Sequence, residues 1–481
     1  MDRKFVVAIL VVAGALAAGC SSPLSSTPNA PGYSVGRFGN HLGGSTPIQH
    51  VIIIMQENRS FNNLFYGFPG AETAGSGMGH GKRYKLQETP LTWPYEMTHS
   101  HAEFLEDYDQ GKSDGFDGYI VYNKDSGSVC TKVNAYNEPQ CWVISKNEKF
   151  KQMAFSYVQR SDIQPYWTMA EEYALGDRTF ASNNGPTFPS HQYMVAGQSG
   201  HATEVPGGAQ WGCNAHDKST TVNLLAYGQA TPPVFSKLTG YEIPGPFPCF
   251  TYATIAGNLD AAGVTWRYYA QKADSGSNLD PFEANNPIWT GPDRANIISP
   301  DTVVLKDIAS GNLANVSWVT PSGHKSDHPG EVPGNLGPSW VASIVNAVGE
   351  SQYWNSTAII IMWDEWGGWF DPVRPKQYED PETRAYEGLG YRVPVIVVSP
   401  YAKAGYVSHQ QHEIASTARF IEETFGLPFI GSRHKYADQR ADGFDDMFDF
   451  TQQPIPFVPI QSSEDARYFL THSDNTPGDT Y

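Results

Sequence analysis

Two pairs of oxygen-bearing side chains in this sequence could hold a metal ion. Glu57 and Asn58 directly follow an apolar run and place a carboxylate and an amide oxygen side by side. Asp364 and Glu365 follow a second apolar run, and adjacent carboxylates repel each other unless a cation or a proton lies between them. Hard cations prefer such oxygens. The Glu-Asn pair alone is equally typical of a turn or a helix cap, and Asp371 is either part of this set or a solvated loop acid.

Thr187 is the candidate nucleophile. Gly185 and Pro186 favour a sharp turn before it, and Pro189 suits the first turn of a helix, so Thr187 is predicted at a helix N-terminus. Free backbone N–H groups and the positive end of the helix dipole attract an anion there and lower the cost of turning a hydroxyl into an alkoxide. A plain helix cap is the alternative interpretation of Thr187.

Histidines that could transfer protons stand in loop-like segments. They are His99, with His101 close behind it, and His328 in a Ser-Asp-His-Pro stretch. For any one of them, a surface histidine is the alternative interpretation. A hydroxyl nucleophile, a cation held by acidic side chains and histidines for proton transfer are together what phosphoryl transfer requires.

Three apolar, β-branched runs predict the strands that position these residues. They span 50–55, 357–363 and 393–398, and each is typical of a strand buried on both faces of a parallel sheet. Helices are predicted over 339–348 and 413–424. Active sites of open α/β sheets lie beyond the carboxyl ends of the strands. We therefore expect an α/β fold with a mostly parallel central sheet flanked by helices.

The composition is that of a globular protein. With 40% hydrophobic and 13% aromatic residues, the chain is neither disordered nor collagen-like nor a coiled coil. Its 481 residues fit one large domain, with long loop insertions predicted at 67–91 and 271–300, where turn-forming residues are common. A balance of 32 basic to 50 acidic residues gives a net charge of −18, which argues against a nucleic-acid-binding surface.

Residues 1–20 predict an export signal of the lipoprotein type. A short basic start precedes an apolar run of about 14 residues, whereas roughly 20 are needed to span a bilayer, so a transmembrane helix is the weaker alternative. Small residues lead to Cys20, the expected lipidation site. We expect a flexible tether over 21–46, a catalytic domain over 47–460 and a tail over 461–481. The protein is predicted to be exported, either periplasmic or anchored to the outer membrane or cell surface through its lipid.

Four further cysteines suit an oxidising compartment. Proximity in sequence favours pairing Cys130 with Cys141 and Cys213 with Cys249, although four cysteines allow three connectivities. Zinc binding is the alternative, but no CxxC or HxxxH spacing accompanies them. Disulfides are therefore the preferred interpretation.

A set of motifs resembles the bacterial phosphoesterase family of phospholipases C and acid phosphatases. The motifs run from about residue 50 to residue 450 in the family's order: HVIIIMQENRSFNNLF, DRTFASNNGPTFPSHQYMVAG, SDHP, AIIIMWDEWGGWFDPV, YRVPVIVVSPYAKAGYVSHQQHEIASTARFIEETFGLP and FDDMFDF. The resemblance implies an alkaline-phosphatase-like α/β fold. It also implies cleavage of phosphate esters through a covalent phospho-enzyme on Ser or Thr.

The same resemblance implies a role for each matching residue. It makes Thr187 the nucleophile, and makes His99 and His328 the histidines that contact the phosphate or protonate the leaving group. The implied metal ligands, besides the Thr187 oxygen, are the four oxygen-bearing residues Glu57, Asn58, Asp364 and Glu365. Two departures from the family pattern, His191 and Trp366, are the candidate substrate-contacting residues.

The leading hypothesis is metal-dependent hydrolysis of phosphate esters through a phospho-threonine, with phospholipase C-type cleavage of phosphodiesters. The alternatives are acid phosphatase action on phosphomonoesters and a non-catalytic surface binding protein on the same fold. Sulfatase chemistry is disfavoured because the segment at Thr187 lacks the C/S-x-P-x-R pattern. One divalent ion is expected, Ca²⁺, Mg²⁺ or Zn²⁺. The expected partners are a phosphate-ester substrate, with phospholipid a candidate, and a membrane through Cys20, but no nucleic acid or required protein partner.

Overall fold

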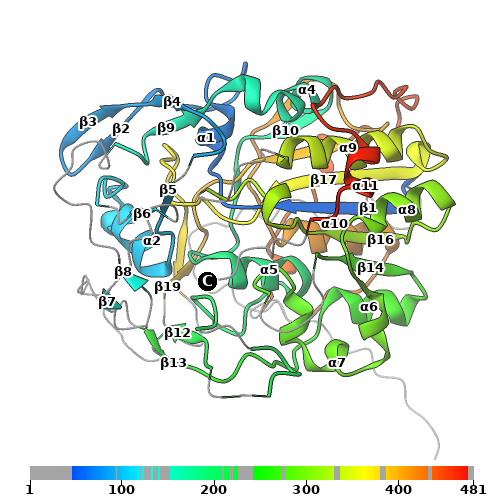
Figure 1. Ribbon diagram of the computed structural model, residues 1–481, viewed down its shortest axis with the longest axis horizontal. Coiled ribbons are helices and arrows are strands. Elements are labelled where there is room, and N and C mark those ends of the chain that lie inside the picture. The colour runs from blue at the N-terminus through cyan, green and yellow to red at the C-terminus, as the bar shows by residue number, and fades with distance from the viewer. Residues whose placement is uncertain are drawn as a thin grey trace, which may run out of the picture. The chain divides into compact units, whose positions relative to one another are not determined.

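A sheet of eight strands forms the centre of the fold. The computed structural model describes residues 46–474 apart from 94, 119–120, 124–131, 134–138, 141–151, 208–210, 217, 219, 226–241, 272–276, 330–335, 380–385 and 432–435. The strands pair in the order β15, β14, β16, β1, β17, β20, β10 and β21 (Figure 1). Their bounds are β1 His50–Gln56, β10 Ala174–Gly176, β14 Trp266–Tyr269, β15 Ile297–Ile298, β16 Val316–Val319, β17 Thr357–Trp363, β20 Val395–Val398 and β21 Tyr406–Ser408.

The two longest strands of the sheet, β1 and β17, lie side by side at its middle. They are parallel and in register, with Val51 opposite Ala358 and Met55 opposite Met362. Residues from Val51 to the end of β1, and every residue of β17, are buried. Continuous β-branched and apolar sequence forms a strand here because helices cover both faces of the sheet and no face meets water.

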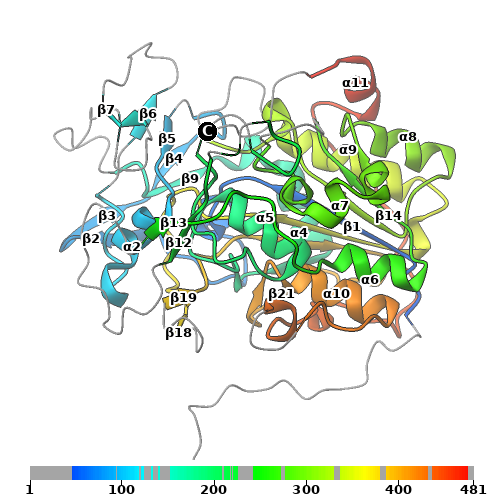
Figure 2. The same ribbon diagram turned by 90° about the horizontal axis from the view of Figure 1, so that it is seen from below.

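Helices form a layer on each side of the sheet. One layer holds α4 (Gln164–Glu172), α8 (Val303–Ser310), α9 (Gly337–Gly349) and α11 (Ala466–Thr471), with α4, α8 and α11 each packed on α9. The other holds α5 (Thr187–Ala196), α6 (Ile255–Ala262) and α10 (Ser416–Phe425), with α5 packed against both of the others. Figure 2 shows α9 and α10 on opposite sides of the strands.

Smaller elements surround this core. A group of short strands and helices lies at one end of the sheet, at the left of Figure 1. It comprises α1 Phe61–Phe65, α2 His101–Tyr108, β2 Ser76–Gly79, β3 Lys82–Lys85, β4 Gln87–Thr89, β5 Tyr95–Met97, β6 Val121–Asn123 and β9 Ser156–Val158. The other described elements are β7 Lys132–Val133, β8 Pro139–Gln140, β11 Thr179–Phe180, β12 Asn223–Leu225, β13 Glu242–Pro244, β18 Gln377–Glu379, β19 Tyr386–Gly388, β22 His412–Glu413, α7 Asn286–Trp289, and the 3-10 turns η1 Asp109–Gly111, η3 Arg160–Asp162, η4 Pro281–Ala284, η5 Pro292–Asn296, η6 Gly323–Lys325, η7 Trp354–Ser356, η8 Ala437–Gln439 and η9 Asp445–Met447.

The predicted α/β architecture is confirmed, with one correction. The runs 50–55 and 357–363 form the expected parallel strands, and the helices predicted over 339–348 and 413–424 correspond to α9 and α10. The run 393–398 forms β20, but β20 is antiparallel to both of its neighbours, β17 and β10. Its carboxyl end therefore lies at the opposite edge of the sheet from the ends of β1 and β17.

All the described residues belong to one unit that spans Asn40–Tyr481. Its end is held by α11, where the ring of Phe469 lies 5.1 Å from the ring of Trp340 on α9. Beyond α11, the carboxylate of Asp474 accepts hydrogen bonds from Ser322 and His324. In the described part of the chain, no helix has the length and apolar character needed to cross a membrane.

Candidate active site

The carboxyl ends of β1 and β17 bring the two predicted ligand pairs together. Because the strands are neighbours in register, the residues that follow them meet at one edge of the sheet. The backbone N–H of Asn58 donates to Oδ1 of Asp364 at 3.1 Å, and the N–H of Asp364 donates to the carbonyl of Gln56 at 3.1 Å. Glu57 and Glu365, like Asn58 and Asp364, have no exposed surface. Three carboxylates and an amide therefore share one buried sheet edge.

The backbone at this edge is packed too closely for most side chains. Asn58 has a positive φ of 55°, a conformation that Asn tolerates better than most residues do. Gly367 has a φ of 62°, and a Cβ there would come within 2.2 Å of the carbonyl oxygen of Asn58. A Cβ at Gly185 would come within 2.3 Å of the carbonyl oxygen of Thr203. Glycine is required at both positions because the backbone of another segment occupies the space.

Thr187 is the first residue of α5, as the turn and proline pattern predicted. The residue is fully buried, and its hydroxyl forms a hydrogen bond with Asp364 that lowers the pKa of that carboxyl against the effect of burial. The turn before the helix is fixed by Ser190, whose hydroxyl donates to Oδ1 of Asn183 at 2.9 Å. The N-terminus of α5 therefore faces the acidic edge of the sheet.

The donor set at this edge fits a hard divalent cation. Burial raises the pKa of Asp364 to about 7, opposed by the N–H of Asn58 and the hydroxyl of Thr187. Oδ1 of Asn58 is buried and has no hydrogen-bond partner among the residues that the structure describes. Buried carboxylates beside an unsatisfied amide oxygen are the surroundings that a bound cation would complete. Glu57, Asn58, Asp364 and Glu365 are therefore the residues that could hold it.

Two histidines border the oxygen-bearing residues. Nε2 of His99 lies 3.1 Å from Nδ2 of Asn58 and 3.9 Å from Oε1 of Glu365. The ring of His328 lies 5.6 Å from that of His99, and Glu96 joins them, so that one potential ligand atom from each of the three lies within 4.8 Å of the others. Glu96 was missed by the sequence analysis because an isolated acid three residues before a histidine carries no specific signal.

The loop that carries His328 is fastened to the end of β1. The Gln56 amide donates to the last carbonyl of η6 at 3.0 Å and its Oε1 accepts from the N–H of Asp327 at 3.1 Å. The hydroxyl of Ser326 donates to Oε2 of Glu57 at 3.0 Å and accepts from the N–H of His328 at 3.0 Å. The position of His328 relative to the predicted metal ligands is thus set by consecutive contacts along both segments.

The two candidate substrate-contacting residues have different surroundings. Nε2 of His191 lies 3.8 Å from Oδ2 of Asp364, and burial lowers the pKa of His191 to about 3, so the imidazole is neutral. Trp366 is fully buried, and its indole N–H donates to Oδ2 of Asp107 at 3.0 Å. The ring of Trp366 packs against Phe104 and Tyr391, so in this structure it has no exposed face to offer a ligand.

Asp371 is neither a site acid nor a solvated one. It is fully buried and forms a two-pronged ion pair with Arg392, whose Nε donates to Oδ1 at 2.7 Å and whose guanidinium donates again to Oδ2 at 3.1 Å. The same carboxylate accepts from the backbone N–H groups of Asn62 and Val373. Asp371 therefore fixes the segment that follows β17.

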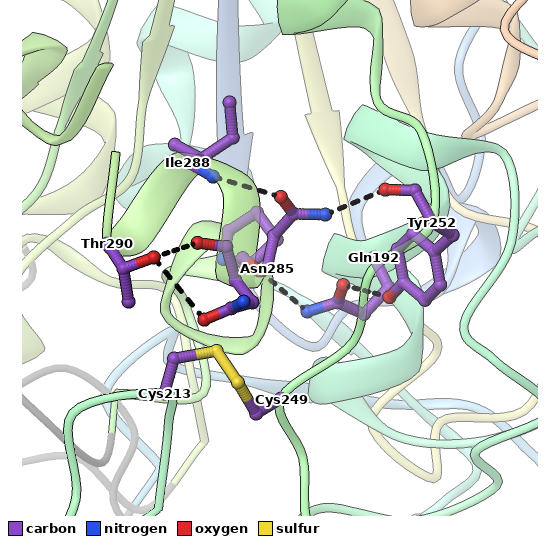
Figure 3. Close-up of a disulfide and its surroundings, with 9 residues drawn as sticks. Gln192, Cys213, Cys249, Tyr252, Asn285, Ile288 and Thr290 are labelled. Atoms are coloured by element: carbon purple, nitrogen blue, oxygen red, sulfur yellow. Dashed lines mark hydrogen bonds between the residues drawn. A yellow bond between two sulfur atoms is a disulfide. The ribbon is translucent and has the colours of Figure 1, made fainter. Parts of the chain in front are cut away.

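The predicted disulfide between Cys213 and Cys249 is present. Cys20, Cys130 and Cys141 lie outside the described residues. Figure 3 shows the disulfide beside a set of hydrogen bonds that reach α5. The amide of Asn285 donates to the carbonyl of Tyr252 at 3.0 Å, and the hydroxyl of Tyr252 donates to Oε1 of Gln192, a residue of α5, at 2.5 Å (Figure 3).

Comparisons with known proteins agree with this geometry. The family model described as "Phosphoesterase family" matches residues 48–428. The chain is 26% identical to the non-hemolytic phospholipase C of Pseudomonas aeruginosa over 466 residues, with 88% of this chain and 61% of that protein covered. It is 25% identical to phospholipase C A of Mycobacterium tuberculosis, with 82% and 76% covered. A solved alkaline phosphatase superfamily protein from Vibrio parahaemolyticus aligns with a TM-score of 0.33 and 10% identity, covering 57% of this chain and 62% of that one.

Proposed function

This chain belongs to the phosphoesterase family, and on that premise we propose that it is an enzyme that hydrolyses phosphate esters through a covalent intermediate on Thr187. The observation that carries the proposal is the position of Thr187 at the first turn of α5, hydrogen-bonded to Asp364 within a buried acidic cluster. A plain helix cap would not need carboxylates beside it. A nucleophile that forms a phosphate ester needs a cation there, and carboxylates are the groups that hold one.

In this proposal, the N-terminus of α5 binds the phosphate group. Its free N–H groups and positive dipole end orient the anion, and the Thr187 hydroxyl attacks phosphorus. A divalent cation held by Glu57, Asn58, Asp364 and Glu365 would neutralise charge on the phosphate oxygens and favour the alkoxide. Full burial of these side chains excludes water, which strengthens each electrostatic contact with the phosphate.

His99 and His328 are suited to contact the phosphate or to move a proton at the leaving oxygen. Nδ1 of His99 lies 2.8 Å from the carbonyl of Met97 and Nδ1 of His328 lies 2.7 Å from the carbonyl of Pro329. A carbonyl only accepts, so each Nδ1 carries a hydrogen and each Nε2 is the atom that exchanges a proton with the substrate. Water then hydrolyses the phosphate ester of Thr187 and regenerates the hydroxyl.

We propose phospholipase C-type cleavage of phosphodiesters as the preferred reaction. Both reported relatives bear the name phospholipase C, which supports this choice. Hydrolysis of phosphomonoesters needs the same nucleophile and cation and is the alternative. The two reactions differ in whether the pocket accepts a second ester substituent on phosphorus, so a comparison of rates separates them.

The test is hydrolysis of p-nitrophenyl phosphate and p-nitrophenyl phosphorylcholine by the wild-type protein, with and without chelator, and by Thr187→Ala. We expect both activities to fall to background in the variant, while the matched exposed control Thr451→Ala keeps them. Rapid acid quenching during turnover should trap a phosphoryl group on the peptide that contains Thr187. Activity that survives in Thr187→Ala would reject Thr187 as the nucleophile.

We also propose that the protein is exported and anchored to a membrane through a lipid on Cys20. The signal-like composition of residues 1–20 supports this. Expression of the full chain with a lipid-labelling precursor should label the wild type and leave Cys20→Ser unlabelled and released from the membrane fraction. Equal labelling of the two proteins would reject Cys20 as the site.

A further inference from the structure

Three buried side chains that come from separate segments meet beside the acidic edge of the sheet. Glu96 lies in β5, His99 follows β5, and His328 lies in the loop after η6. A potential ligand atom from each lies within 4.8 Å of the other two, and the residues are only 2%, 5% and 3% exposed. A carboxylate and two imidazoles brought this close form a metal-ligating set, because a single ion at their centre could contact all three.

The hydrogen bonds of the two imidazoles fix the tautomer that metal binding needs. Nδ1 of His99 donates to the carbonyl of Met97 and Nδ1 of His328 donates to the carbonyl of Pro329. The lone pair of each neutral ring is therefore on Nε2. Metal-binding histidines almost always have their second nitrogen tied to a carbonyl or carboxylate in this way, which orients the ring and makes the ligating nitrogen more basic.

The charge at the site also favours more than one cation. Glu57, Asp364 and Glu365 are fully buried, and Glu96 adds a fourth buried carboxylate close to them through His99. One divalent ion would balance two of these four carboxylates when all are ionised. A second would balance the remaining two, before the substrate brings the negative charge of its phosphate.

We propose that Glu96, His99 and His328 hold a second divalent cation, next to the ion held by the oxygen ligands. This inference rests on the proposed function, in which the oxygen ligands take the first ion. Two histidines and one glutamate with an open position form a donor set typical of catalytic zinc, so the second site would take a borderline-soft ion such as Zn²⁺. Nε2 of His99 lies 3.9 Å from Oε1 of Glu365, so that carboxylate is placed to contact both ions.

The second cation changes what the two histidines do. A Nε2 that ligates a metal has no proton to give, so His99 and His328 would hold an ion at the leaving-group oxygen instead of protonating it. Paired cations of this kind stabilise the attacking and the leaving oxygens of an in-line displacement together. The reaction would then depend on two ions rather than on one ion and an imidazolium.

The experiment is metal stoichiometry. The protein is stripped with chelator, dialysed against Zn²⁺ alone, and its bound metal is measured by plasma mass spectrometry. We expect two ions per chain for the wild type and one for Glu96→Gln and for His328→Gln. The exposed controls Glu88→Gln and His80→Gln should keep both ions. Circular dichroism of the stripped proteins shows whether each variant is folded.

Substitution with Co²⁺ gives a second readout that does not depend on activity. Cobalt in a four-coordinate site with imidazole ligands absorbs visible light strongly, whereas cobalt in a six-coordinate oxygen site absorbs weakly. The strong bands should be lost in His328→Gln and kept in His80→Gln. Their presence in a folded His328→Gln would overturn the assignment.

The outcomes separate this inference from the proposed function. A wild type that binds one ion at saturation, or variants that keep both ions, would overturn the second site whether or not the protein is active. A wild type that binds two ions and loses one in each variant would support the site even if p-nitrophenyl phosphate and p-nitrophenyl phosphorylcholine are not hydrolysed. In that case only the proposed reaction would fail.

Discussion

Replacing Asp364 by Asn should stabilise the metal-free protein. Burial raises the pKa of Asp364 from 3.8 to about 7, against the hydrogen bonds from Asn58 and Thr187. Between these two values the folded protein binds a proton that the unfolded chain has lost, so the free energy of unfolding falls as the pH rises from 3.8 to about 7. Because one pKa unit corresponds to about 1.4 kcal/mol, the complete loss is about 4 kcal/mol.

The measurement is urea unfolding of the wild type and Asp364→Asn in chelator, at intervals between pH 4 and pH 8. We expect similar stability at pH 4, where the carboxyl is neutral in both states, and an advantage of about 4 kcal/mol for the variant at pH 8. The matched control is Asp442→Asn, an exposed position. It should follow the wild type throughout, so the difference curve reports on Asp364.

Adding a divalent cation should reverse the order. A cation that binds only the folded wild type adds about 2.7 kcal/mol to the free energy of unfolding at a concentration of 100 times Kd, and more at higher concentrations. Asp364→Asn should gain much less because it lacks a ligand charge. A metal-free variant no more stable than the wild type at pH 8 would refute the reasoning, because burial of a carboxylate would then not be the source of the shifted pKa.

Three more perturbations test the surroundings of the site. Asp371→Asn removes the charge that faces buried Arg392 and should cost about 3–5 kcal/mol of unfolding free energy in urea, whereas a loss below about 1 kcal/mol would contradict the buried pair. Glu422→Gln should raise stability at pH 8 by roughly 3 kcal/mol, because burial and then Asp438 raise the pKa of Glu422 to about 9, and the wild type loses stability as the pH rises from 4.5 to 9. Gln56→Leu should lower kcat on p-nitrophenyl phosphate roughly tenfold with a smaller change in KM, because it frees the loop after η6. An unchanged kcat would reject that positioning role.

The strands and the site edge could be predicted because the signal is local. Runs of β-branched residues with no polar interruption form strands only where both faces are covered, which fits β1 and β17 along their whole length. Polar residues at the ends of such strands are then placed by the sheet. The position of Thr187 was predictable for a similar reason, because the turn and proline pattern around it defines a helix start.

Other features depend on contacts between distant segments and leave no local pattern. An apolar run is equally suited to a parallel or an antiparallel strand, so the direction of β20 could not be deduced from its residues. Asp371 could not be assigned because its partner Arg392 is supplied by another segment. Glu96 gains significance only because the fold brings His328 to the same place.

The protein's own cations do not complete the acidic site. Arg59, the cation nearest in sequence to the end of β1, is fully buried, and its hydrogen bonds go to the carbonyls of Asp327 and Leu91 and to the side chain of Asn63. Burial lowers the pKa of Arg59 to about 10, yet it remains charged at neutral pH and serves the neighbouring loop. The long apolar contacts of β1 and β17 therefore have to offset the repulsion among the carboxylates until ions bind. Ion binding and folding stability should consequently rise and fall together in this protein.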